Sequence, residues 1–350
     1  LDALVCNGRV DDAAGLFSKW KGRVKPNTVI YSTLIKGYAT AHQSGKAMAA
    51  WKEMRATGVQ INTVVYNALI DAQARVGATD EVAELRQAME RDGCVADVIT
   101  YSTTVKSYCV KGDLDRALEE FRYMQRNGMA DEPIIYNTML DGCARHGRFD
   151  LADSIWEDME RCKVAPSNFT LGILVKMHGR RKQLDKAFEL VESLPRRHGF
   201  VANAQVSTCL MCACLNNGAT DRAFQVFEAL KRSSKGADAK AYSALISGCV
   251  RHNHLGMAHQ LVEEAYGLDG GRPCPGALQE TESVEQLLKA YAQRGLMEQQ
   301  GVPLLESLRV AKVPINSRVF ASTFGHGAAG SQGGQRGGGG GGRGSRAARR

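Results

Sequence analysis

The stretch that decides the fold is TVVYNALIDAQARVGATDEVAELRQAMERDGCVAD, residues 63–97. In its first half, apolar side chains fall at Tyr66, Leu69 and Ile70, which lie on one face of a helix. In its second half, Val82 and Met89 lie 16 and 23 positions after the tyrosine and mark a second apolar helix face. The stretch therefore predicts two helices that pack together as a hairpin.

The same pattern returns along most of the chain. The slot of Tyr66 is filled again at spacings of 35 residues, with one spacing of 36 and a last one of 42. These anchor residues are Tyr31, Tyr66, Tyr101, Tyr136, Leu171, Ser207, Tyr242 and Val284. A further start lies at Phe320, and a first partial copy ends near Asn27. Self-similarity at such a period indicates units that bury their apolar faces by stacking on their neighbours.

Other columns keep the same register. Position +16 is a small residue that lets two helices approach closely: Ala47, Ala117, Ala152, Ala187, Ala223 and Ala258. Position +23 is a long apolar residue: Met54, Met89, Met124, Met159, Leu194 and Leu230. Position +14 is an acid near the start of the second helix, where the helix dipole favours it: Asp80, Asp115, Asp150, Asp185 and Asp221. Glycines that tolerate a left-handed cap close this helix: Gly58, Gly93 and Gly128. The sequence predicts an all-α solenoid of helical hairpins.

The array resembles the pentatricopeptide repeat family in its plain, P-type form. The segments that carry the resemblance are TVVYNALI (63–70), KGDLDRALEEFRYM (111–124), HGRFDLADSIWEDM (146–159) and KPN (25–27). The Trp-Leu-Gly-Tyr pattern of the tetratricopeptide repeat is missing. The resemblance implies a right-handed superhelix of antiparallel hairpins. We expect a partial first repeat in 1–27, regular repeats in 28–266, an insertion loop in 267–280, a degenerate repeat or cap in 281–324 and a disordered Gly/Arg-rich tail in 325–350.

The resemblance also implies binding of single-stranded RNA, about one base per repeat, because unpaired bases expose edges that a few side chains can read. Family members read with the residue after the anchor and the last residue of the repeat. The pairs that match are Ser32 with Asn62 for adenine, Asn67 with Asp97 for uracil, Asn137 with Ser167 for cytosine and Thr208 with Asp238 for guanine. Two further pairs, Ser102 with Glu132 and Gly172 with Asn203, leave their base undecided. With parallel polarity, the expected core is 5′-A-U-x-C-x-G-3′.

An apolar residue two positions before the anchor sandwiches the base in this family. Five repeats supply one: Val29, Val64, Ile99, Ile134 and Phe169. The later repeats carry Gln205, Lys240 and Glu282 in this column, so we expect base reading mainly in the first five. A second interpretation of the reading columns stays open, because Ser, Thr and Asn are also common helix caps.

Composition narrows the possible classes of protein. The net charge is +8, but five arginines and no acid lie in residues 325–350, which leaves 8 − 5 = +3 on the rest of the chain. Phosphate contacts must then come from a local basic groove, or from arginines of the tail. No apolar run is long enough to span a membrane. Because the chain begins at Leu1, we expect an N-terminal portion, with any targeting peptide, to lie outside this sequence.

No constellation for catalysis, metal or cofactor binding stands out. The H-x-E and P-C-x-x-C motifs of a deaminase, a P-loop, a dinucleotide fingerprint and H-E-x-x-H are all missing. Three of the ten cysteines, Cys143, Cys214 and Cys249, fall on the buried +7 column. Cys209 and Cys212 lack a second spaced pair that zinc would need. We therefore expect a non-catalytic protein without metal or cofactor.

Three functions remain. The favoured hypothesis is a sequence-specific RNA-binding protein of the chloroplast or mitochondrion, an assignment implied by the family, that affects RNA stability, processing or translation. The second is a protein-binding helical scaffold of the tetratricopeptide kind. The third is an RNA adaptor that recruits an editing or nuclease partner. The reading columns distinguish them, since a protein scaffold has no reason to place these polar pairs there.

Overall fold

A computed structural model describes residues 1–233 and 236–315, and this part of the chain contains helices but no β-strand. The tail predicted for 325–350 and the end of the degenerate repeat lie outside the described residues. The helices are α1 (Asp2–Cys6), α2 (Val10–Trp20), α3 (Thr28–Thr40), α4 (Ser44–Ala56), α5 (Thr63–Arg75), α6 (Thr79–Arg91), α7 (Val98–Lys111), α8 (Leu114–Arg126), α9 (Pro133–His146), α10 (Phe149–Arg161), α11 (Asn168–Arg180), α12 (Leu184–His198), α13 (Ala204–Asn216), α14 (Thr220–Lys231), α15 (Ala239–Arg251), α16 (Leu255–Tyr266), α17 (Glu282–Gln293) and α18 (Val302–Val310), with a 3₁₀ turn η1 (Ala277–Gln279) and a π-helical turn η2 (Met297–Gly301).

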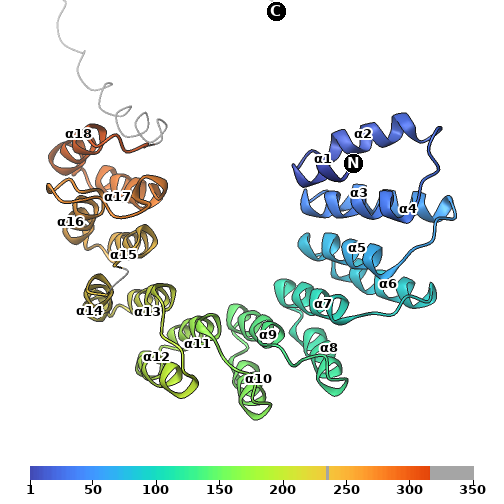
Figure 1. Ribbon diagram of the computed structural model, residues 1–350. Coiled ribbons are helices and arrows are strands. Elements are labelled where there is room, and N and C mark those ends of the chain that lie inside the picture. Colours follow the sequence, from blue (N-terminus) through green and yellow to red (C-terminus); the bar gives the residue numbers. More distant parts are fainter. Residues whose placement is uncertain (234–235, 316–350) are drawn as a thin grey trace, which may run out of the picture. The chain divides into compact units, whose positions relative to one another are not determined.

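The chain divides within α14 into two compact units, Leu1–Val226 and Phe227–Arg350. In unit 1, helices α3 to α12 form five successive antiparallel pairs, and each first helix also packs on the first helix of the next repeat. Figure 1 shows α7, α9, α11 and α13 on the inner side of this unit and α8, α10 and α12 on the outer side. The predicted all-α solenoid of helical hairpins is confirmed.

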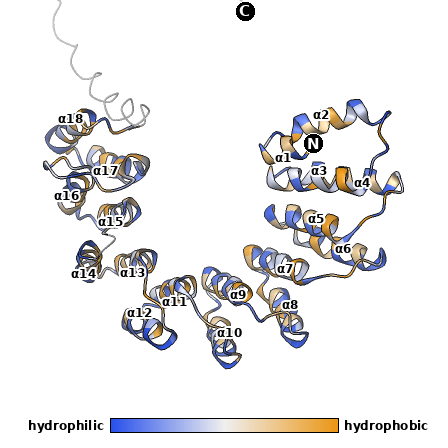
Figure 2. Ribbon diagram, viewed as in Figure 1, coloured by the Kyte–Doolittle hydropathy of each residue, from blue (hydrophilic) through white to orange (hydrophobic). Residues whose placement is uncertain are grey.

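The repeat columns form the core of the hairpins. All six alanines at +16 are completely buried, as are the methionines at +23. The anchors Tyr31, Tyr66 and Tyr136 are buried, and each ring packs edge-on against an aromatic ring from the second helix of the preceding repeat: Phe17, Trp51 and Phe121. Each helix thus has an apolar face toward the core and a polar face toward water, and Figure 2 shows both colours on the helices of unit 1. Burial of these columns, at about 25 cal/mol per Å² of apolar surface, holds the repeats together.

The acids at +14 also link neighbouring repeats. Each lies in the first turn of a second helix, as the dipole argument predicted. Within unit 1, three of them form ion pairs with an arginine of the following repeat: Asp80 with Arg116 at 3.3 Å, Asp115 with Arg148 at 3.3 Å and Asp185 with Arg222 at 2.9 Å. These pairs are exposed, so each adds little to stability.

The N-terminal helix pair has a short first helix. The first helix, α1, has five residues where the first helices of the following repeats have 13 or 14. It packs on α2 and α3, and its Val5 side chain approaches Gly37 so closely that a Cβ there would clash.

Unit 2 contains the helix pair α15 and α16, followed by the insertion and α17, η2 and α18. The insertion is a largely exposed surface loop, and hydrogen bonds connect it to both α15 and α16. The amide of Ala239 donates to the carbonyl of Pro275 at 3.3 Å, and the Tyr266 hydroxyl donates to the carbonyl of Glu280 at 3.0 Å. Across the described residues of both units, no helix combines the length and apolar character that crossing a membrane requires.

Candidate nucleic-acid interface

A row of large apolar side chains is exposed on the first helices of unit 1. Each is the second residue of its helix, and the exposed fractions are 69% for Val29, 45% for Val64, 63% for Ile99, 68% for Ile134 and 66% for Phe169. These are the residues that the sequence predicted to sandwich bases. A large apolar residue exposed at the same place on five successive first helices indicates a binding face, since the core of the solenoid does not need these side chains.

The first reading residue lies one helical turn after each apolar residue, on the same helix face. Ser32, Asn67 and Ser102 are half-buried there, whereas Asn137 is only 6% exposed. The Ser32 hydroxyl donates to the carbonyl of Val29 at 2.9 Å, so its oxygen keeps lone pairs for a ligand donor. In α13, the Thr208 hydroxyl donates in the same way to the carbonyl of Ala204 at 2.9 Å.

The second reading residue caps the first helix of the following repeat. Asn62 accepts the amide of Val65 at 3.1 Å, Asp97 that of Thr100 at 2.9 Å, Ser167 that of Phe169 at 3.2 Å, Asn203 that of Val206 at 3.1 Å and Asp238 that of Ala241 at 2.9 Å. Glu132 occupies the same place without a side-chain cap bond. The capping interpretation of this column is thus correct for these residues except Glu132.

Capping determines which polar atom of each residue remains free to bind a ligand. When Asn62 uses Oδ1 as the cap, its Nδ2 remains as a donor. When Asp238 uses Oδ1, its Oδ2 remains as an acceptor. Ser167 accepts the capping hydrogen bond through its hydroxyl oxygen and keeps its hydroxyl proton to donate. The hydrogen-bonding character of each position is therefore set before any ligand arrives.

The predicted pair Asn67 and Asp97 is in direct contact. Asn67 Nδ2 donates to the Asp97 carboxylate, at 3.1 Å from Oδ1 and 3.3 Å from Oδ2, although the residues lie 30 positions apart. The hydroxyl of Thr100 lies 2.6 Å from Asn67 Oδ1 and 2.9 Å from Asp97 Oδ1. Partial burial acts to raise the pKa of Asp97, but hydrogen bonds from Thr100 and Asn67 outweigh it, and the pKa lies below its usual value. The carboxylate is therefore ionised and accepts hydrogen bonds only.

Two hollows open between successive apolar residues. The first, of about 420 Å³, lies between Ile99 and Ile134 and is lined by the predicted pair Ser102 and Glu132. The second, of about 590 Å³, lies between Ile134 and Phe169 and is lined by the pair Asn137 and Ser167. In both, the structure brings together two apolar walls and the two reading residues of a single repeat.

The second hollow contains an unpartnered polar atom. Asn137 Oδ1 is buried and has no hydrogen-bond partner in the protein. A buried polar atom without a partner is costly, so Asn137 is suited to a ligand that donates a hydrogen bond. Lys106 and Arg145 line the same hollow together with the acids Glu132 and Asp141, so positive and negative side chains are equal in number there.

The comparisons with known proteins agree with this architecture. Matches to the PPR repeat family cover residues 61–110 and 132–180, those to the pentatricopeptide repeat domain cover 16–74, and those to the PPR repeat cover 99–129, 206–234 and 240–265. Together these segments span more than half of the chain. The chain belongs to the pentatricopeptide repeat family.

Two relatives illustrate the similarity. The chain is 22% identical over 173 residues to the mitochondrial 15S rRNA processing factor CCM1 of Komagataella phaffii, which is 48% of this chain and 22% of that protein. It resembles the crystal structure of maize PPR10 in complex with an 18-nt psaJ RNA element, with a TM-score of 0.64 and 17% identity over 91% of this chain and 47% of that one. The chain thus spans less than half the length of either relative.

Other chemistry is sparse. Among the residues that the structure describes, no three His, Cys, Asp or Glu side chains are grouped so that they could hold a metal ion. Cys143, Cys214 and Cys249 are buried on the +7 column, and burial raises the pKa of each thiol to about 11. These thiols are neutral and act as small apolar core residues.

Sequence reasoning missed one participant in the site. Thr100, buried directly before an anchor, orients both Asn67 and Asp97. Its signal is a threonine three residues after an Asp cap, which is the pattern of a capping box. Thr170 completes the same box with Ser167.

Proposed function

We propose that this chain binds single-stranded RNA along the apolar row of unit 1, with about one base held between the walls of successive repeats. The observation that carries the proposal is the pairing of apolar walls with reading residues whose donors and acceptors are fixed by capping. Stacking of a base on an aromatic ring such as that of Phe169 contributes about 1–3 kcal/mol, the aliphatic walls contribute through burial of apolar surface, and the polar pair then selects the base.

The fixed polarity supports the base assignment. Ser32 offers an acceptor and Asn62 a donor, which suits the amino group and ring nitrogen N1 of adenine. Asn67 offers a donor and Asp97 an acceptor, which suits O4 and the ring N3–H of uracil. Both assignments follow from hydrogen-bond chemistry and agree with the family pairs.

The third assignment rests on the second hollow. The unpartnered Asn137 Oδ1 suits the amino group of cytosine, and the hydroxyl proton of Ser167 suits its ring nitrogen N3. For Thr208 and Asp238, which belong to different units, the guanine assignment rests on the family pair alone. The proposed core remains 5′-A-U-x-C-x-G-3′, with the bases opposite Ser102 and Glu132, and opposite Gly172 and Asn203, unassigned.

We further propose that the protein acts in an organelle on RNA processing, stability or translation. The relative from Komagataella phaffii is a mitochondrial rRNA processing factor, which favours the mitochondrion over the chloroplast. The simplest mechanism is non-catalytic: the bound solenoid blocks exonucleases or keeps a segment unpaired, with or without an RNA-processing partner. Incubation of bound RNA with a processive exonuclease should then leave a protected fragment that contains the core.

The deciding experiment compares binding of the full chain to single-stranded RNA that contains A-U-x-C-x-G and to shuffled RNA of the same composition. The proposal expects tighter binding of the designed sequence. Equal affinity for both RNAs would reject sequence reading. Absence of RNA binding even at low salt would reject RNA as the ligand and favour the protein-binding scaffold.

A further inference from the structure

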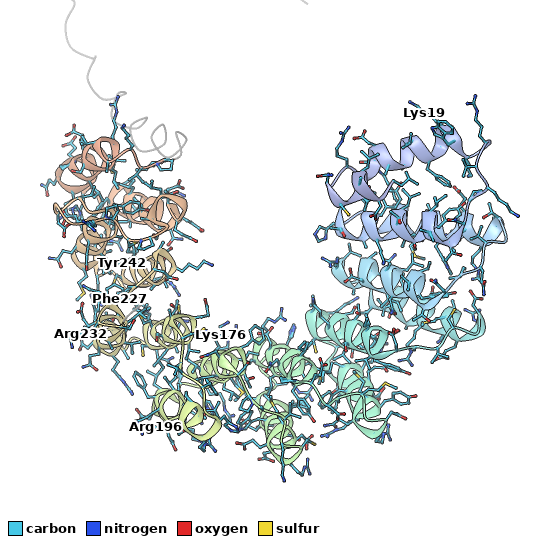
Figure 3. The ribbon with its side chains drawn as sticks, viewed as in Figure 1. Lys19, Lys176, Arg196, Phe227, Arg232 and Tyr242 are labelled. Atoms are coloured by element: carbon cyan, nitrogen blue, oxygen red, sulfur yellow. The ribbon has the colours of Figure 1, made fainter. Side chains whose placement is uncertain are left out.

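Three lysines repeat on the inner helices of unit 1 at every second repeat. Lys36, Lys106 and Lys176 each lie five residues after an anchor and are separated by 70 residues. All three are exposed, and none forms an ion pair within the described chain. Figure 3 shows Lys176 on the inner side of unit 1, whereas Arg196 of α12 lies on the outer side.

The lysines share the face of the candidate interface. Each lies seven residues after the apolar wall residue of its helix, which is nearly two full turns, so both side chains project in almost the same direction. Each also lies one turn beyond the first reading residue. The contact of Lys106 with the hollow of Asn137 and Ser167 supports this placement, because that hollow belongs to the next repeat.

The intervening repeats differ in charge. At the position of the lysines they carry Asp71 and Asp141, which form ion pairs with Arg75 at 2.8 Å and Arg145 at 2.6 Å one turn further along. The positive charge of these two arginines is therefore offset locally. At this +5 position the sign of the charge therefore alternates between successive repeats, with a lysine at every second one.

We propose that Lys36, Lys106 and Lys176 bind phosphates of the RNA backbone, one phosphate for every two nucleotides held by unit 1. This inference rests on the proposed RNA binding and extends it to the residues that set affinity and salt dependence. A lysine ammonium is a point charge with three donors and suits a phosphate oxygen without reading the base. Outside residues 325–350 the chain has little excess positive charge, so a few lysines at defined positions supply most of the electrostatic attraction to RNA.

The test is the slope of log affinity against log salt concentration for the full chain with the A-U-x-C-x-G RNA. Each neutralised phosphate of a single strand contributes about −0.7 to this slope. The triple variant Lys36→Gln, Lys106→Gln, Lys176→Gln should therefore have a slope shallower by about 2. Between 50 and 200 mM salt, wild-type affinity should fall about 20-fold more than that of the variant.

Two further variants separate the outcomes. A triple change of exposed lysines on second helices, Lys19→Gln, Lys52→Gln and Lys186→Gln, removes the same charge and should leave the slope nearly unchanged. The triple Lys→Arg variant at the proposed positions should keep the wild-type slope. The preference for the designed over the shuffled RNA should persist in all of them.

The inference is overturned if wild type prefers the designed RNA and the triple Lys→Gln variant, folded by circular dichroism, keeps the wild-type slope. An equal loss of slope in the control triple would also overturn it, because the effect would then reflect net charge alone. If wild type binds neither RNA, the proposed function itself fails, and that result is distinct from a failure of the lysine assignment.

Discussion

Replacing Asp97 by asparagine should change the preferred base at the second position of the core from uracil to cytosine. In the variant, Oδ1 can still accept the amide of Thr100, now at 2.9 Å, and can keep its 3.1 Å contact with Asn67. Oδ2 is replaced by an NH₂ group that donates, so the longer contact of 3.3 Å from Asn67 Nδ2 to Oδ2 is lost. The ring N3–H of uracil would then meet a donor, whereas the ring nitrogen N3 of cytosine would gain one.

The size of the change follows from these two hydrogen bonds. Each is worth about 1 kcal/mol net, so losing one with uracil and gaining one with cytosine shifts the ratio of affinities by about 2 kcal/mol, roughly 30-fold. Stability should change little, because Asn and Asp cap helices about equally well. Loss of the charge at the start of α7 should cost about 0.3–1 kcal/mol through the helix dipole.

The assay is competitive binding of four RNAs that differ only at the second base. A matched control is Asp113→Asn, because Asp113 caps α8, a second helix, by accepting the amide of Arg116. It should cost similar stability without altering the preferred base. If a folded Asp97→Asn protein still prefers uracil as strongly as wild type, Asp97 does not face the base, and the assigned register is wrong.

Three other changes test separate parts of the structure. Phe169→Ala should weaken RNA binding by about 1–3 kcal/mol and leave the melting temperature nearly unchanged, because the ring is largely exposed; unchanged affinity in a titration would exclude stacking there. Ala152→Leu should destabilise the fold by about 1–3 kcal/mol in denaturant unfolding, since the site is fully buried between helices; a neutral result would contradict the close approach of α9 and α10. Alkylation of the native protein at pH 8 should label the exposed Cys6 and Cys162 and spare Cys109, whose burial raises the pKa of its thiol to about 12. If mass spectrometry detects rapid labelling of Cys109, its repeat opens in the native protein.

Much of the fold could be predicted from the sequence because burial in a repeat array is periodic. A column such as Ala117 and Ala152 constrains the same contact in every hairpin, so several weak local signals reinforce one another. Lys163 shows the limit of such patterns. It follows α10 with a φ of 56°, where other repeats use a glycine, and the sequence alone gives no sign of this left-handed residue.

The candidate site was predicted less completely, because its chemistry depends on contacts between repeats. In the sequence, a column of Ser, Asn and Asp residues has two competing explanations, helix capping and base reading. The geometry removes the competition: the atom that caps the helix, such as Asn62 Oδ1, is consumed, and the remaining Nδ2 defines what the position can recognise. Capping thus holds the free atom in a fixed position before a base binds. A modest, neutral hydrogen bond needs this preorganisation in order to discriminate between bases. It follows that a cap substitution which keeps the oxygen but changes the free atom alters specificity, whereas one that removes the oxygen alters stability as well.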